Sequence, residues 1–176
     1  MAFIPQIDYE TASPEVKKAH DDHLKVGKMT NMKRTLLNSV PAFNALMEWY
    51  TLRAEAAKFL SDLDITIFCW SISNTNECMI CSLFFTKILV DAGIDIEKFE
   101  LDKKQKLLQD FGAALVKDPK GLVNEEMFAR LREFFNDEQI VLLDAFGAIM
   151  IATNLINSSL KVDLDGYLGG YISRKG

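Results

Sequence analysis

The sequence has neither the excess of positive charge typical of a nucleic-acid-binding protein nor the N-terminal pattern typical of an exported one. It contains 20 lysines and arginines against 25 aspartates and glutamates, and no basic cluster is large enough to form a nucleic-acid-binding face. The N-terminal residues contain neither a basic segment nor an apolar stretch of signal-peptide length. We therefore expect no DNA or RNA partner and a cytoplasmic location.

Long uninterrupted apolar runs are also missing. Residues 140–156 are interrupted by Asp144, Thr153 and Asn154, and residues 65–72 are too few to cross a bilayer. We interpret both segments as buried helices and expect no membrane partner. Because the helices expected around residues 65–92 are apolar on nearly every side, we also expect subunit contacts in a homo-oligomer.

The alternation of apolar and polar residues that predicts a strand is absent, so the fold class expected is all-α. Hydrophobic residues make up 49% of 176 positions, enough for the core of one domain over residues 1–176. Capping residues and apolar spacing predict the helices, with Thr75 or Asn76 as the cap of the fifth. The expected helices cover residues 14–26, 31–39, 41 to at least 52, 62–73, 77–92, 103–117, 125–135 and 137–158, with a helical turn at 95–99 and an irregular tail from 162.

Cysteine is scarce, and the odd count of three argues against a structural disulfide framework. Two of the thiols, Cys78 and Cys81, stand three positions apart near an expected helix start, where the helix dipole favours a thiolate. Positions three apart share a helix face with β-carbons roughly 5–6 Å apart, so a small adjustment allows a disulfide. The spacing therefore indicates a redox pair in which one thiolate attacks and the other thiol resolves the intermediate.

The same spacing also supplies half of many zinc sites, and a third alternative is a pair of inert buried cysteines. Zinc would need two further ligands. Cys69 is nine positions upstream of Cys78 and has the surroundings of a buried, small apolar thiol. His20 and His23 could share a helix face, but a solvated face is the preferred interpretation. We therefore expect neither a metal ion nor a cofactor.

The stretch from Leu60 through Cys81, followed by a helix ending at Gly93, resembles the carboxymuconolactone decarboxylase and alkylhydroperoxidase D-like family, especially its small peroxidase-related members. Looser similarity covers most of the chain. The residues that carry it are Ile4-Pro5, Pro14, Gly27 with Asn31, Pro41 and residues 153–157. The lactone decarboxylases of this family lack the Cys pair, so its presence favours the redox branch.

The resemblance implies an all-helical, alkylhydroperoxidase D-like domain that assembles into trimers or hexamers. It also implies thiol-dependent reduction of hydroperoxides or disulfides by an antioxidant enzyme. Cys81 would be the thiol oxidised to a sulfenic acid. Cys78 would resolve it and then exchange with a protein or small-molecule thiol reductant.

Three positions depart from the family's peroxidase pattern, and one of them is Ile80, just before Cys81, where a His or Tyr is common. Where that pattern has a Glu twelve residues before the first Cys, this chain has Thr66, and where it has a His four residues after the second, this chain has Phe85. Those groups would form a proton relay for the nucleophile and the leaving oxygen, so we expect weak peroxidase activity. Thr66 and Glu77 are candidate supporting residues, although the preferred interpretation of Glu77 is a first-turn acid that stabilises the helix.

Two other functions stay open at this point. The chain could be a non-catalytic binding or scaffold member of the same fold, because it keeps the thiols and loses the relay. A decarboxylase or hydrolase of cyclic acids would want His, Arg or carboxylates near the motif, and the two His are far from it in sequence.

Overall fold

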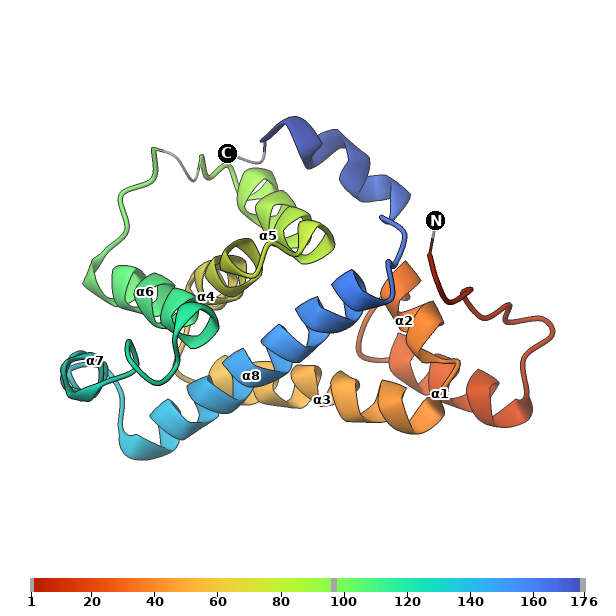
Figure 1. Cartoon of the computed structure of the whole chain (residues 1–176), viewed down its shortest axis with the longest axis horizontal. Helices are drawn as coiled ribbons and strands as arrows, with labels where there is room; N and C mark the ends of the chain where they lie inside the picture. Colours follow the sequence, from red (N-terminus) through yellow and green to blue (C-terminus); the bar gives the residue numbers. More distant parts are fainter. Residues whose placement is uncertain (1, 96–97, 175–176) are drawn as a thin grey trace.

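The computed structural model describes residues 2–95 and 98–174, and over these ranges the chain is helical and contains no strand (Figure 1). The all-α prediction is therefore confirmed for the described residues. The helices are α1 (Pro14–Leu24), α2 (Asn31–Leu36), α3 (Val40–Ala56), α4 (Asp62–Thr75), α5 (Met79–Asp91), α6 (Lys103–Lys117), α7 (Glu125–Arg132), α8 (Asp137–Ser159) and the 3-10 helix η1 (Gly166–Arg174).

The helix starts follow the capping residues. Ser61 begins α4 with a reciprocal capping box, in which its Oγ accepts from the Asp64 N–H at 3.1 Å and the Asp64 carboxylate accepts from the Ser61 N–H at 3.1 Å. Asp102 and Gln105 form the same arrangement at the start of α6. The predicted starts of both helices are confirmed, because the signal that fixes a helix start is local in sequence.

Helix α4 is the centre of the fold. It packs against α5, α6 and α8, and Figure 1 shows it between α5 and α6. Fully buried Phe68 on α4 lies 6.0 Å from the ring of Phe111 on α6 and 6.1 Å from the ring of Phe146 on α8. A Cβ at Gly112 would stand 3.0 Å from the Phe68 carbonyl oxygen, so the glycine lets α6 approach α4 closely. The chain itself therefore covers α4, whereas α5 leaves apolar side chains such as Met79 exposed.

Helix α8 is the one helix of the described residues that is long and apolar enough to cross a membrane by length and composition. It packs along α3 and against α4 and α6 (Figure 1). Its inward residues Phe146 and Met150 belong to the main hydrophobic cluster. These contacts are those of a core helix, as the sequence predicted.

Several helix ends differ from the predictions. Helices α1, α2 and α7 end two or three residues early, because their last residues continue as hydrogen-bonded turns rather than helix. The tail predicted to be irregular contains η1, which packs on α5 and buries Leu168 completely. The burial of Leu168 therefore stabilises a helix in a segment whose glycines disfavour one. In the expected turn at 95–99, the N–H groups of Lys98 and Phe99 donate to the Asp95 carbonyl, and residues 96–97 lie outside the described residues.

Candidate active site at the cysteine pair

The chain reverses direction between α4 and α5, and this turn positions the cysteines. Asn76 ends α4 by donating its N–H to the Ile72 carbonyl at 2.9 Å, and Glu77 adopts a left-handed conformation with φ 55°. Cys78 is the N-cap residue of α5, with its N–H donating to the Ser73 carbonyl at 3.1 Å. The predicted cap, Thr75 or Asn76, is therefore wrong, because α4 continues through Thr75 and Asn76 is its C-cap residue.

Cys78 and Cys81 are buried free thiols in contact with each other. Cys78 is 1% exposed and Cys81 is 6% exposed. The pKa of Cys78 is lowered to about 7, mainly because the Cys81 thiol donates a hydrogen bond to the Cys78 sulfur. The N–H groups of Cys81 and Ile80 and the Ser158 hydroxyl stabilise the same thiolate. The pKa of Cys81 is raised well above its usual value, because it donates that hydrogen bond and is buried. Above about pH 7 the pair therefore shares one proton, with the negative charge mainly on Cys78.

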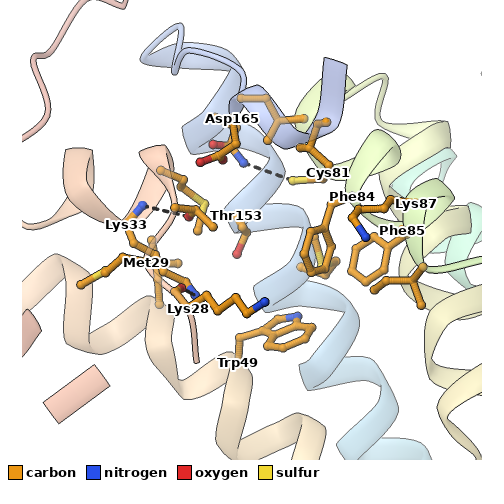
Figure 2. Close-up of a pocket in the computed structure, with 18 of the residues that line it drawn as sticks. Lys28, Met29, Lys33, Trp49, Cys81, Phe84, Phe85, Lys87, Thr153 and Asp165 are labelled. Carbon is orange, nitrogen blue, oxygen red and sulfur yellow. Dashed lines mark hydrogen bonds between the residues drawn. The ribbon is translucent and has the colours of Figure 1, made fainter. Parts of the chain in front are cut away.

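Asn157 connects α8 to the pair. Its Nδ2 donates to the Cys81 sulfur at 3.1 Å, and this contact favours a thiolate at Cys81 (Figure 2). The Asn157 side chain is buried, and its Oδ1 has no hydrogen-bond partner within the described chain. Sequence reasoning missed this residue, although a buried amide in an otherwise apolar helix is the kind of signal that could have pointed to it.

A cavity of about 640 Å³ lies beside the pair and is lined by Cys81 but not by Cys78. Its wall is mostly apolar. The apolar residues include Met29, Met32, Met47, Trp49 and Phe84. Phe85, which occupies the position of the family's His, also lines it. A substrate in this cavity would therefore meet the Cys81 side of the pair and no imidazole from position 85.

The structure does not bring the candidate supporting residues into this cavity. Thr66 is buried, but its hydroxyl donates to the Asp62 carbonyl at 2.7 Å, and the residue does not line the cavity. Glu77 is exposed in the α4–α5 turn and does not line the cavity either. A supporting role for either residue stays a prediction.

His23 is not on a solvated face, contrary to the expectation. It is 4% exposed and packs between the rings of Phe43 at 5.5 Å and Tyr50 at 5.2 Å on α3. Burial lowers its pKa to about 4, with a contribution from the charge of Lys33, so the ring is neutral at pH 7. The expectation of a solvated face was wrong because α1 packs on α3, a contact that the local sequence does not reveal.

The remaining candidate ligands do not assemble into a metal site. His20 is half-buried and hydrogen-bonded to Asp21 at 2.9 Å. Cys69 is fully buried, and burial raises the pKa of its thiol, as expected for an inert apolar thiol. Among the residues that the structure describes, no three His, Cys, Asp or Glu side chains lie close enough to hold one metal ion.

The shared proton predicts the pH dependence of thiol reactivity. Alkylation of the reduced protein by iodoacetamide should rise with pH and reach half its maximal rate near pH 7, because the pKa of Cys78 is about 7. Cys81→Ala removes the thiol that donates to Cys78 and should move this midpoint to higher pH. The rates are measured by mass spectrometry, with Cys69→Ala as the control that leaves the midpoint in place. A wild-type midpoint near the ordinary thiol value of about 8.5 would contradict the shared proton.

Comparison with known proteins gives likeness in structure alone, since no protein-family model and no curated protein matches the chain. An alkylhydroperoxidase AhpD core, a peroxidase-related protein from Ralstonia eutropha JMP134, is 19% identical with a TM-score of 0.73, over 95% of this chain and 94% of that one. A peroxidase-related protein from Silicibacter sp. TM1040 is 20% identical with a TM-score of 0.72, over 94% of this chain and 95% of that one. The debrominase Bmp8 is 14% identical with a TM-score of 0.76, over 97% of this chain and 96% of that one.

Proposed function

Because this chain has the alkylhydroperoxidase D-like fold, we propose that it is a thiol oxidoreductase that reduces hydroperoxides or disulfides through Cys78 and Cys81. One observation carries the proposal. Cys81 lines a cavity while in hydrogen-bond contact with Cys78, and Cys78 holds the negative charge of the pair. A substrate in the cavity would therefore contact the Cys81 thiol, whose hydrogen-bond partner, the Cys78 thiolate, can act as a base.

This arrangement offers a substitute for the missing Glu and His. The Cys78 thiolate accepts the Cys81 proton, and the new Cys81 thiolate receives the Asn157 hydrogen bond. The Cys81 sulfur attacks the terminal oxygen of a hydroperoxide, the O–O bond breaks, and the leaving alkoxide takes the proton from Cys78 to become an alcohol. The Cys78 thiolate then attacks the sulfenic acid of Cys81. A disulfide forms, and hydroxide leaves and takes a proton from solvent to become water.

Two electrons must then return to the disulfide. A dithiol, or two equivalents of a protein or small-molecule thiol, would reduce it by thiol–disulfide exchange. With Phe85 in the cavity wall in place of an imidazole, we propose that turnover with simple peroxides is slow and that disulfide substrates depend less on a relay. A cytoplasmic location, a homo-oligomer of three or six subunits and the thiol reductant belong to the same proposal.

Oxidation of the purified protein tests this function. One equivalent of cumene hydroperoxide should convert two of the three thiols to an intramolecular disulfide, because the second thiol resolves the first. Peptide mapping should place the bond between Cys78 and Cys81, and Cys69 should stay free. If both thiols stay reduced in the native protein and react only after unfolding, the oxidoreductase proposal fails. The non-catalytic binding or scaffold alternative would then stand.

The likeness to a debrominase supports testing a second reductive use of the same pair. Replacing an aryl bromine by hydrogen needs two electrons, and a dithiol supplies them by becoming a disulfide with release of bromide and a proton. A brominated phenol incubated with the reduced protein should release bromide if this reaction occurs. The hydroperoxide reaction is the primary proposal, because two of the three compared structures are peroxidase-related proteins.

A further inference from the structure

The cavity contains a buried lysine that the reaction above does not use. Lys33 on α2 is 6% exposed, and its Nζ donates to the Lys28 carbonyl at 2.6 Å and to the Tyr50 hydroxyl at 2.7 Å. No carboxylate forms an ion pair with it in the part of the chain that the structure describes. Asp165, the carboxylate whose charge acts on Lys33, instead accepts the Asn31 N–H at 3.0 Å. The third N–H of the ammonium is therefore left for a cavity ligand.

A buried ammonium whose hydrogen-bond partners are both neutral oxygens is costly, because neither partner carries the opposite charge. Burial accordingly lowers the pKa of Lys33 to about 8. An anion placed against this ammonium would supply the missing charge and a charge-assisted hydrogen bond. A second donor points to the same conclusion, because the buried indole N–H of Trp49, which also lines the cavity, has no partner within the described chain.

The rest of the cavity suits an apolar body. Met29 lines it from the loop before α2, Met32 from α2 and Met47 from α3, and Phe84 lines it from α5. Methionine side chains adapt to irregular ligand shapes. Figure 2 shows Lys33 on one side of the cavity and Cys81 on the other, with Thr153 between them and Phe84 beside Cys81. A ligand reaching from Lys33 to Cys81 would thus be anionic at one end and apolar along its length.

We propose that the cavity binds an amphipathic organic acid, with its carboxylate on Lys33, its apolar body against the methionines and Phe84, and its reducible group at Cys81. This inference rests on the proposed function for the identity of the reducible group. The binding of the acid itself does not depend on the thiol chemistry. The two ideas can therefore fail separately.

Binding of laurate to the Cys81→Ser protein tests the proposal without any reaction. Laurate and dodecanol have the same alkyl chain and differ in the head group, so isothermal titration calorimetry should show tighter binding of laurate by about tenfold or more. Equal affinities would overturn the proposal, since the apolar wall alone would then account for binding. This comparison uses one folded protein and does not depend on a change at Lys33.

Lys33→Met tests the residue itself. It keeps the apolar stem and removes the ammonium, so laurate binding should weaken by about tenfold or more while dodecanol binding changes little. Lys25→Met is the matched control, because Lys25 is an exposed lysine paired with Asp22 outside the cavity, and it should leave both affinities unchanged. Undiminished laurate binding by a folded Lys33→Met protein would refute the assignment. Laurate binding without peroxide-driven disulfide formation would count against the proposed function alone.

Discussion

Replacing Cys81 by serine should abolish the intramolecular disulfide and lower hydroperoxide reduction by about a thousandfold or more, the usual scale for loss of a nucleophile. Cys81 is the member of the pair that lines the cavity, and a serine hydroxyl does not form a sulfenic acid or a disulfide. The measurement is the loss of cumene hydroperoxide in the presence of dithiothreitol. Cys69→Ala should retain wild-type turnover, because that thiol is buried away from the cavity.

The reciprocal variant tells which sulfur attacks. Cys78→Ser removes both the base and the resolving thiol, so the Cys81 sulfenic acid should form more slowly and stay unresolved, and dimedone labelling followed by peptide mapping should find the label on Cys81. The electrostatics make this a sharp test, because the resting charge is on Cys78 while access is through Cys81. A sulfenic acid that accumulates at Cys78 in the Cys81→Ser protein would reverse the assignment. Full turnover by both single variants would refute the mechanism.

Truncation of Phe68 to alanine should remove about 3–5 kcal/mol of the free energy of unfolding, which is a large share of the total for a domain of this size. Phe68 is fully buried where α4, α6 and α8 meet, and its ring lies near those of Phe111 and Phe146. The cavity left behind cannot close easily, because it would lie at the meeting point of three packed helices. Urea denaturation followed by circular dichroism measures the loss.

Phe134→Ala provides the control for this stability prediction. Phe134 is 40% exposed after the end of α7 and makes a single ring contact, with Phe135 at 6.3 Å. Its truncation should cost less than about 1.5 kcal/mol, because much of its side chain is already in water. If the two variants lose equal stability, α4 is not the centre of the cooperative core.

The sequence predicted those parts of the structure whose signals are local. The capping residues Ser61 and Asp102 located two helix starts, and the spacing of Cys78 and Cys81 located the candidate site. The sequence placed the turn between α4 and α5 two or three residues too early, because Glu77 is not a residue type that marks a left-handed conformation. The N-cap position of Cys78 follows from that turn and was missed with it.

The rest of the site is assembled from distant parts of the chain. Asn157 is 76 positions from Cys81, and its contact depends on how α8 crosses the bundle. Lys33 is brought to the cavity by the packing of α2 on α3, and nothing in its neighbourhood in sequence distinguishes it from a surface lysine. The domain boundaries, the oligomeric state and the roles of Thr66 and Glu77 stay predictions.

The burial of Cys69 has a consequence for the fidelity of the redox cycle. Three thiols allow three pairwise disulfides, and exchange among them requires a thiolate. The raised pKa of Cys69 keeps its thiol protonated and therefore unreactive in exchange, although Cys78 and Cys81 belong to the same core cluster. In the proposed cycle Cys69 would therefore not compete for a disulfide, and its buried side chain contributes to packing alone.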